Sequence, residues 1–410
     1  MSLRLTQDGL ARVAVFLACA SAVAALASIA ASQLLLALAL AALLMSNLRL
    51  RLPPVWLPLA VFLAGTLVAI AASENPAAGR PQVRKLFAYL MLPVVYSAVG
   101  SLRQARVLVA AWGALASASA LVALGQFVQK AYRVRTEGVG FYEYYVGERI
   151  SGFMSHWMTF GAQMMIVVLM LVAFLLFSVS ARGHLRWPGI LAVALIAVAL
   201  VLNMTRSIWL ASGVAALYLV WHWKRHLLWL APVALAAVLA AGPGSVRTRL
   251  ISIVQPRQEV DSNLHRIVCW RTGLRMVQAH PWLGLGPEVV RLRFNEYVPP
   301  DAPQPLPRGW YGHLHNLYLH YAAERGIPTA MALVWLLAQA FWELNRAARR
   351  AELAAPEARF LLHGAAACVL AIALAGFFEV NLGDSEVLML FLAVLACGYL
   401  ARERVEVGRA

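Results

Sequence analysis

The chain has 410 residues, of which 61% are hydrophobic and only 13% are charged, and its formal net charge is +16. A soluble domain would hold about a quarter charged residues, so this apolar surplus indicates a protein embedded in lipid. The sequence lacks the alternating segments of a membrane β-barrel, and the predicted fold is therefore an all-α integral membrane protein. Nucleic acid is not an expected partner, because much of the Lys and Arg lies in short loops between apolar runs.

Apolar runs long enough to cross a bilayer recur along the chain and predict about 12 transmembrane helices. The predicted spans are 11–28, 31–47, 54–72, 86–100, 106–128, 157–179, 187–203, 206–222, 226–242, 315–342, 359–377 and 385–401. The first two spans are nearly continuous, so one long kinked helix is an alternative there. An even number of spans places both termini on the same side of the membrane.

Basic residues identify that side, because short cytoplasmic loops are enriched in Lys and Arg. Alternate loops carry such residues: Arg49, Arg51, Arg103, Arg106, Arg182, Arg186, Lys224, Arg225, Arg346, Arg349 and Arg350, with Arg402 and Arg404 in the C-terminal tail. Both termini are therefore predicted to be cytoplasmic. The loop with Arg80, Arg84 and Lys85 contradicts this pattern, and we interpret it as flanking an interfacial helix.

The predicted organisation has three parts: about nine N-terminal transmembrane helices in 1–242, a large outer loop with short helices in 243–314, and about three C-terminal transmembrane helices in 315–410. A second long outer loop, 129–156, is rich in Tyr, Arg and Glu. In the large loop, Asp261, Ser262 and Asn263 are candidate caps for a helix that ends near His280. Long ordered loops on a helical scaffold usually carry function.

Histidines and an amide gather where the large loop meets the next span: His313, His315, Asn316 and His320. At helical spacing, His315, Asn316 and His320 would approach one cavity near the membrane surface. Such a polar cluster suits a general base or a substrate ligand, and an interfacial cap is the structural alternative. A metal site is the weakest interpretation, because no carboxylate motif accompanies the two histidines. No metal and no cofactor are predicted.

Arginines form a second group of candidates at the outer ends of spans or in outer loops. Arg206, Arg266 and Arg149 are each able to clamp a phosphate with paired N–H donors. The alternatives are a snorkelling side chain for Arg206 and a solvated helix face for Arg266. Of the acids near the outer span ends, Glu379 or Asp384 would orient a histidine or an arginine, and Asp384 is equally suited to cap a helix.

Several common catalytic motifs are missing from the sequence. There is no metal-binding DxD pair, no P-loop and no GxSxG elbow in an outer loop. A donor that already carries a good leaving group needs little beyond charge stabilisation and a base, which the arginines and histidines would supply.

These motifs together resemble the bacterial O-antigen ligases, a family shared with O-antigen polymerases and some protein O-oligosaccharyltransferases. His315-Asn316 followed by Gly326 and Thr329 is a pattern typical of the ligases. Supporting matches are RISGF at 149–153 with His156 and Thr159, Thr205-Arg206-Ser207, and the run from Arg266 through Trp270 to Gly286. The resemblance extends over nearly the whole chain.

The resemblance implies a GT-C-like, metal-independent and inverting glycosyltransferase of the bacterial inner membrane, with its active site on the periplasmic face. Its donor would be undecaprenyl-pyrophosphate-linked glycan and its acceptor a sugar hydroxyl of lipid A–core. Membrane lipids would be its other partners. His315 would be the base, with His313 in reserve, and Arg206, Arg266 and Arg149 would bind the pyrophosphate. Supporting positions would be Asn316, Trp270 and Asp384.

Three other functions remain open at this point. An O-antigen polymerase and a protein O-oligosaccharyltransferase use the same kind of donor and differ in the acceptor. A transporter for a lipid-linked glycan belongs to another class and predicts charged residues near mid-membrane, ideally in two related halves. The ionisable residues of this chain instead cluster at span ends and in loops, and no half-to-half repeat is visible.

Overall fold

The computed structural model describes residues 7–178, 183, 185–253, 255, 263–354 and 356–407. Within these residues all regular structure is helical, which confirms the all-α prediction. Arg182, Asp261 and Ser262, which the topology and capping predictions used, lie outside the described residues. The candidate cap Asn263 is the first residue of its helix.

The N-terminal helices are α1 (Gln7–Ala24), α2 (Ile29–Met45), α3 (Trp56–Ala71), α4 (Arg80–Lys85), α5 (Met91–Ala98) and α6 (Leu102–Glu137), with a 3-10 segment η2 (Leu86–Leu90) before α5. α1 and α2 form an antiparallel pair, so the alternative of one kinked helix is wrong. The Ser21 and Ser32 hydroxyl groups each donate to the backbone carbonyl of the other residue, at 2.6 and 2.8 Å. This reciprocal bonding satisfies two buried hydroxyls between apolar helices.

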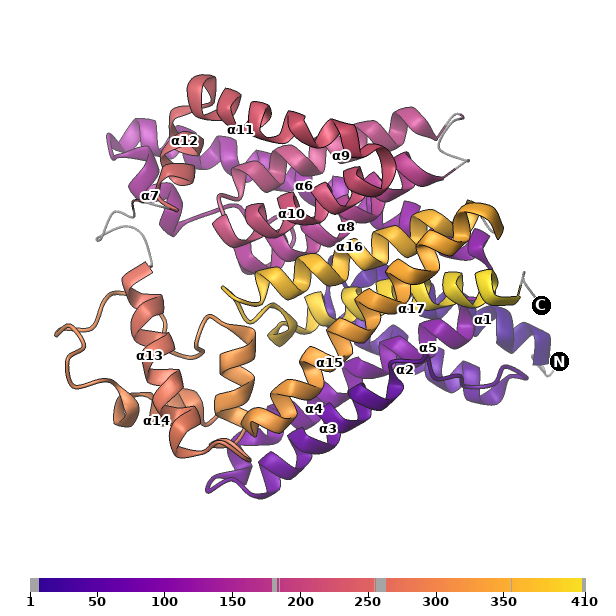
Figure 1. Cartoon of the computed structure of the whole chain (residues 1–410), viewed down its shortest axis with the longest axis horizontal. Coiled ribbons are helices and arrows are strands. Elements are labelled where there is room, and N and C mark those ends of the chain that lie inside the picture. Colours follow the sequence, from indigo (N-terminus) through magenta and orange to yellow (C-terminus); the bar gives the residue numbers. More distant parts are fainter. Residues whose placement is uncertain are drawn as a thin grey trace.

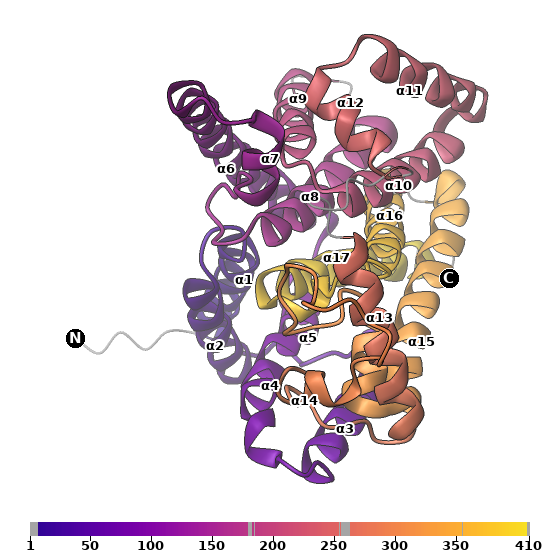
Figure 2. The same cartoon turned by 90° about the vertical axis from the view of Figure 1, so that its left-hand side faces the viewer.

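The middle helices are α7 (Phe141–Gly147), α8 (Trp157–Phe177), α9 (Arg186–Leu202), α10 (Arg206–Lys224), α11 (Leu230–Ala241) and α12 (Gly244–Ile251). The C-terminal helices are α13 (Asn263–Ala279), α14 (Val290–Tyr297), α15 (Leu317–Ala354), α16 (Arg359–Ala375) and α17 (Ser385–Val407). α16 and α17 lie at the centre, with α1–α5 and α6–α12 around them (Figure 2). Most residues of α8, α16 and α17 are buried, whereas α11 has none buried.

Every predicted span overlaps a helix, and among the described residues six helical stretches are long and apolar enough to cross a membrane. These stretches are Gln7–Ala24, Leu102–Glu137, Trp157–Phe177, Arg206–Ala241, Leu317–Ala351 and Ser385–Val407. Shorter apolar helices are Ile29–Met45, Trp56–Ala71, Arg186–Leu202 and Arg359–Ala375. The protein is thus membrane-embedded, while the number of 12 crossings and the GT-C-like architecture stay predictions.

The long helix α15 is broken at Gly326, whose φ of 79° and ψ of 161° are not helical, and Pro328 follows within the same turn. A loop segment docks into this break through three backbone hydrogen bonds: Leu285 N–H to Ala323 O at 2.9 Å, Gly286 N–H to Glu324 O at 2.9 Å, and Ile327 N–H to Pro281 O at 2.8 Å. A Cβ atom at Gly326 would lie 1.9 Å from the Trp282 carbonyl oxygen. Glycine is therefore required, and the break fixes the 281–286 segment against α15.

Figure 1 shows α13 and α14 at one end of the molecule, while α1 begins and α17 ends at the opposite end. The start of α15 and the connection between α16 and α17 reach the same end as α13, since Leu317 N–H donates to the Gly376 carbonyl at 2.7 Å. This end collects the polar side chains that the sequence singled out.

Candidate functional site

The turn before α15 presents His315 with a backbone φ of 49°, in the left-handed region that is uncommon for a residue with a side chain. Its neighbours hold the turn in place. The His315 N–H donates to Nδ1 of His313 at 3.2 Å, and the Asn316 side chain accepts from the Leu319 N–H at 3.0 Å. Trp270 donates from Nε1 to the His315 carbonyl at 3.4 Å. His313, Asn316 and Trp270 therefore position His315.

Glu379, in the connection after α16, links His315 to Arg266 of α13. Its Oε2 lies 3.3 Å from Nδ1 of His315, and its Oε1 accepts a hydrogen bond from the Arg266 guanidinium. The residue is only 4% exposed, so these contacts are shielded from water. Nε2 of His315 lies 3.3 Å from the Trp310 carbonyl. Both ring nitrogens thus face acceptors, which suits the imidazolium formed when the ring takes up a proton.

Two further imidazoles adjoin His315. The His313 and His265 rings lie with their centroids 4.2 and 5.0 Å from the His315 ring. Burial, and then the charge of His315, lowers the pKa of His313 to about 2 and that of His265 to about 4. Both therefore stay neutral near pH 7.

His320 lies one turn into α15, and its ring centroid is 6.2 Å from that of His313, which in turn adjoins His315. Its Nε2 lies 3.5 Å from Glu324 Oε1, in a second polar network. Glu324 also accepts from the Glu288 N–H at 2.7 Å and pairs with Arg325 at 3.1 Å. His315 itself precedes the helix, so helical spacing does not describe its relation to His320.

The loop with Arg80, Arg84 and Lys85, which contradicts the charge pattern of the other loops, belongs to this second network. Gln82 of α4 donates to Glu288 at 2.7 Å and accepts from Arg325 at 3.1 Å. Lys85 donates to the Gly383 carbonyl, and burial lowers its pKa against the opposing effect of Asp384. Lys85 is therefore tied to the polar end of the molecule.

The three predicted arginines lie around the same end. Arg206 donates to the Ser252 carbonyl at 2.6 Å and to the Asn263 side chain at 2.5 Å, so it joins α10 to α12 and α13. Arg149 donates to Val146 O at 3.1 Å and lies 5.2 Å from the Trp157 ring centroid. Arg206 thus donates hydrogen bonds to protein groups of the loop region, whereas a snorkelling side chain would extend into water at the membrane surface.

The charges of these arginines act on one another. Burial, and then Arg249 and Arg266, lower the pKa of Arg149 to about 9, with a smaller effect from Arg206. Glu379 acts in the opposite direction. Guanidinium groups held this close, with one shared carboxylate, create a positive field that favours an anionic ligand.

Arg249 is a member of this group that the sequence analysis missed. It lies on α12, is only 3% exposed, and donates from Nε to the Met204 carbonyl at 2.9 Å and from Nη1 to the Tyr142 hydroxyl at 3.3 Å. Met204 has a φ of 51° in the turn between α9 and α10. The only sequence signal was an arginine on the same helical face as Val246, which does not distinguish it from other loop arginines.

Asp384 immediately precedes α17, and among the described residues its hydrogen-bond partners are neither histidine nor arginine. Its Oδ2 accepts from the Thr159 hydroxyl at 2.7 Å, and its backbone carbonyl accepts from the Leu388 N–H at 2.9 Å. Burial raises the pKa of Asp384, while Thr159 and Lys85 lower it. Glu379 rather than Asp384 orients both His315 and Arg266.

A polar cavity of about 350 Å³ adjoins the arginines between α6 and the 141–151 segment. It is lined by Gln126, Gln129, Lys130, Arg133, Tyr144, Glu148, Arg149 and Ser151. All eight side chains carry hydrogen-bonding groups, and Arg149 also belongs to the arginine group.

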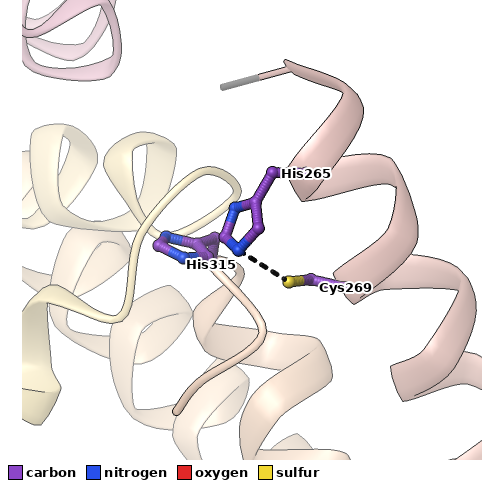
Figure 3. A group of neighbouring side chains, drawn as sticks. All are labelled: His265, Cys269 and His315. Carbon is purple, nitrogen blue, oxygen red and sulfur yellow. Dashed lines mark hydrogen bonds between the residues drawn. The ribbon is translucent and has the colours of Figure 1, made fainter. Parts of the chain in front are cut away.

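Two sets of side chains have metal-ligand spacing, and both include His315. The ligand atoms lie within 4.8 Å of one another in each set, which are His265, Cys269 and His315, and His313, His315 and Glu379. Figure 3 shows the first set, in which His265 and Cys269 extend from one helix toward His315.

Fold and site together define a membrane-embedded helical protein with a partly buried histidine–carboxylate–arginine arrangement at one end of the bundle. Residues 191–334, from α9 into α15, match the family model described as O-antigen ligase. The match covers about a third of the chain, and it agrees with the resemblance that the motifs carry. The matched region contains Arg206, Arg266 and His315, while Arg149 and Glu379 lie outside it. The search of curated proteins found no match.

Proposed function

We propose that the protein is an O-antigen ligase that transfers glycan from an undecaprenyl pyrophosphate donor to a sugar hydroxyl of lipid A–core. The observation that carries this proposal is the linkage through Glu379 of His315 to Arg266, two residues of the family-matched region. One carboxylate thus holds both a base and a phosphate-binding cation. In a displacement reaction the base removes the proton of the attacking hydroxyl group, and the cation stabilises the negative charge on the leaving pyrophosphate.

In the proposed reaction the acceptor oxygen attacks the anomeric carbon from the face opposite the pyrophosphate. The new glycosidic bond forms as the bond from carbon to the pyrophosphate oxygen breaks, so the configuration inverts. His315 takes the hydroxyl proton, and Glu379 stabilises the resulting imidazolium. His313 is the reserve base, although its Nδ1 already accepts the His315 N–H.

Arg266, with Arg206 and Arg149, would bind the pyrophosphate and stabilise it as it leaves. Nε of Arg266 is buried and has no hydrogen-bond partner among the described residues. A buried unpaired guanidinium N–H is costly and is satisfied when an anion binds. The polar cavity beside Arg149 would hold sugar hydroxyls next to that pyrophosphate.

The proposed location is the bacterial inner membrane, with the site periplasmic and both termini cytoplasmic. Two observations support this orientation. The short loops with most basic residues alternate with the others. The start of α1 and the end of α17 lie at the end of the molecule opposite α13 and α14 (Figure 1).

Purified protein, lipid-linked glycan and lipid A–core incubated with EDTA would test the proposal, beside His315→Ala and the loop control His280→Ala. Glycan on lipid A–core with wild type and His280→Ala, and a loss of about 10³-fold in His315→Ala, is the expected result. A longer lipid-linked glycan with bare lipid A–core would instead indicate a polymerase, and glycan on protein Ser or Thr an oligosaccharyltransferase. Glycan movement without a new bond would indicate a transporter.

A further inference from the structure

His265 and Cys269 occupy successive turns of α13 on one face, and His315 approaches that face from the turn before α15 (Figure 3). An i, i+4 pair of ligands on a helix is a common way to hold a zinc-type ion, with a third ligand from another segment. His265 and Cys269 are 3% and 0% exposed, so their contact belongs to the packed interior of the loop region and is not a contact between mobile surface side chains.

The spacing of the pair already matches a metal-bound geometry. Nε2 of His265 and Sγ of Cys269 are 3.7 Å apart. Tetrahedral zinc with bonds of about 2.05 Å to nitrogen and about 2.3 Å to sulfur places these two atoms about 3.6 Å apart. All three ligand atoms lie within 4.8 Å of one another, so a small rotation of the His315 ring would complete the set.

The alternative set of His313, His315 and Glu379 is less suited to an ion. Glu379 is held by the Arg266 guanidinium, and His313 Nδ1 already accepts the His315 N–H. A cation there would have to displace an arginine from its carboxylate. The set with Cys269 leaves the ion pair between Glu379 and Arg266 intact and offers the softer ligand that zinc-type ions prefer.

We propose that His265, Cys269 and His315 bind one divalent ion of the zinc class, and that this ion inhibits the protein by occupying His315. The Cys269 thiol releases its proton to water on binding, and a water molecule fills the fourth position. The inhibitory part rests on the proposed function, because a metal-bound imidazole nitrogen has no lone pair left to accept a proton from a hydroxyl group.

Binding is tested without any transfer assay by adding Co²⁺ to the metal-free protein and recording its absorption spectrum. A thiolate ligand gives a sulfur-to-cobalt charge-transfer band in the near ultraviolet, and tetrahedral geometry gives intense visible bands. The expected result is both bands in wild type and in the control Cys19→Ser, and no charge-transfer band in Cys269→Ser. His265→Gln should weaken Co²⁺ binding at least about tenfold. An unchanged spectrum in Cys269→Ser, or no charge-transfer band in wild type, would overturn the site.

Inhibition is tested by titrating Zn²⁺ into the transfer assay. Wild type should lose transfer and recover it with EDTA, and Cys269→Ser should need at least about tenfold more Zn²⁺ for half inhibition. Equal sensitivity of wild type and Cys269→Ser would contradict the inhibitory role. Failure of the proposed function is recognised separately, because the cobalt bands do not depend on transfer activity. A protein that shows the bands but transfers no glycan would contradict the proposed function and not the metal site.

Discussion

The carboxylate of Glu379 lies 3.3 Å from Nδ1 of His315, although 63 residues separate them in the sequence and they belong to different connections. The same carboxylate holds Arg266, so a single acid positions the proposed base and the proposed pyrophosphate ligand. Its burial makes both contacts stronger than they would be in water.

Glu379→Gln should keep the shape of this contact but remove its charge. The imidazolium of His315 would lose its counter-ion, so we expect kcat to fall by about 10²-fold with a smaller change in KM. The pH profile of kcat should shift as well. Glu296→Gln is the control, because Glu296 pairs with Arg293 on exposed α14. Equal kinetics for wild type and Glu379→Gln would remove Glu379 from the mechanism.

His313→Asn should distinguish the reserve base from the proposed one. The Asn side-chain oxygen can accept the His315 N–H as His313 Nδ1 does, so the turn would be kept. We expect less than about tenfold loss of kcat, against about 10³-fold for His315→Ala, in single-turnover transfer. A larger loss for His313→Asn than for His315→Ala would exchange the two roles.

Arg266→Lys should weaken donor binding because an ammonium group cannot bond with Glu379 and a pyrophosphate in the same planar geometry. The expected result is a rise of about tenfold or more in donor KM, and weaker inhibition by free pyrophosphate. Arg271→Lys on the same helix is the matched control, since Arg271 pairs with the exposed Asp301. Unchanged pyrophosphate inhibition in Arg266→Lys would argue against its role.

Gly326→Ala should destabilise the protein. Alanine is strained at a φ of 79°, and its Cβ would collide with the Trp282 carbonyl. We expect a loss of at least about 2 kcal/mol, measured as a lower apparent Tm in detergent. Gly125→Ala in α6 is the control, because a Cβ there meets nothing within 4 Å. A Tm equal to wild type would mean that the 281–286 segment is not docked at the break.

Acid should weaken the packing of α13. The pKa of His265 is lowered to about 4 in the folded protein. The unfolded chain has a pKa near 6.5 and takes up the proton first. Stability is therefore fully present above about pH 6.5 and declines as the pH falls toward 4. Hydrogen exchange of α13 should be faster at pH 5 than at pH 7 after correction for intrinsic rates. His265→Gln should reduce this difference, and an equal difference in both proteins would contradict the assignment.

The helical class and the approximate positions of apolar helices were predictable from the sequence, because lipid forces long apolar runs to satisfy their own backbone hydrogen bonds. His315 and Arg266 could also be proposed from the sequence, because each belongs to a motif that resembles the O-antigen ligases. Asn316 and Trp270 were named as supporting residues, and both contact the turn that holds His315.

Other parts of the site were not accessible in this way. His320 was grouped with His315 by helical spacing, but the helix begins only at Leu317. Arg249 looked like any loop arginine until the fold buried it beneath the turn at Met204. The choice between Glu379 and Asp384 stayed open, because both acids lie in the connection between α16 and α17.

Sequence alone therefore determined that this is a membrane-embedded helical protein that resembles the O-antigen ligases, and it supplied candidate histidine and arginine residues for a site. Tertiary structure alone decided that Glu379 joins His315 to Arg266, and that Cys269 and His265 face the same imidazole. The physical reason is that hydropathy and helix periodicity act over a few residues, whereas these contacts join segments far apart in the chain. Such contacts depend on how α13, α15 and the α16–α17 connection pack, and no local pattern encodes that packing.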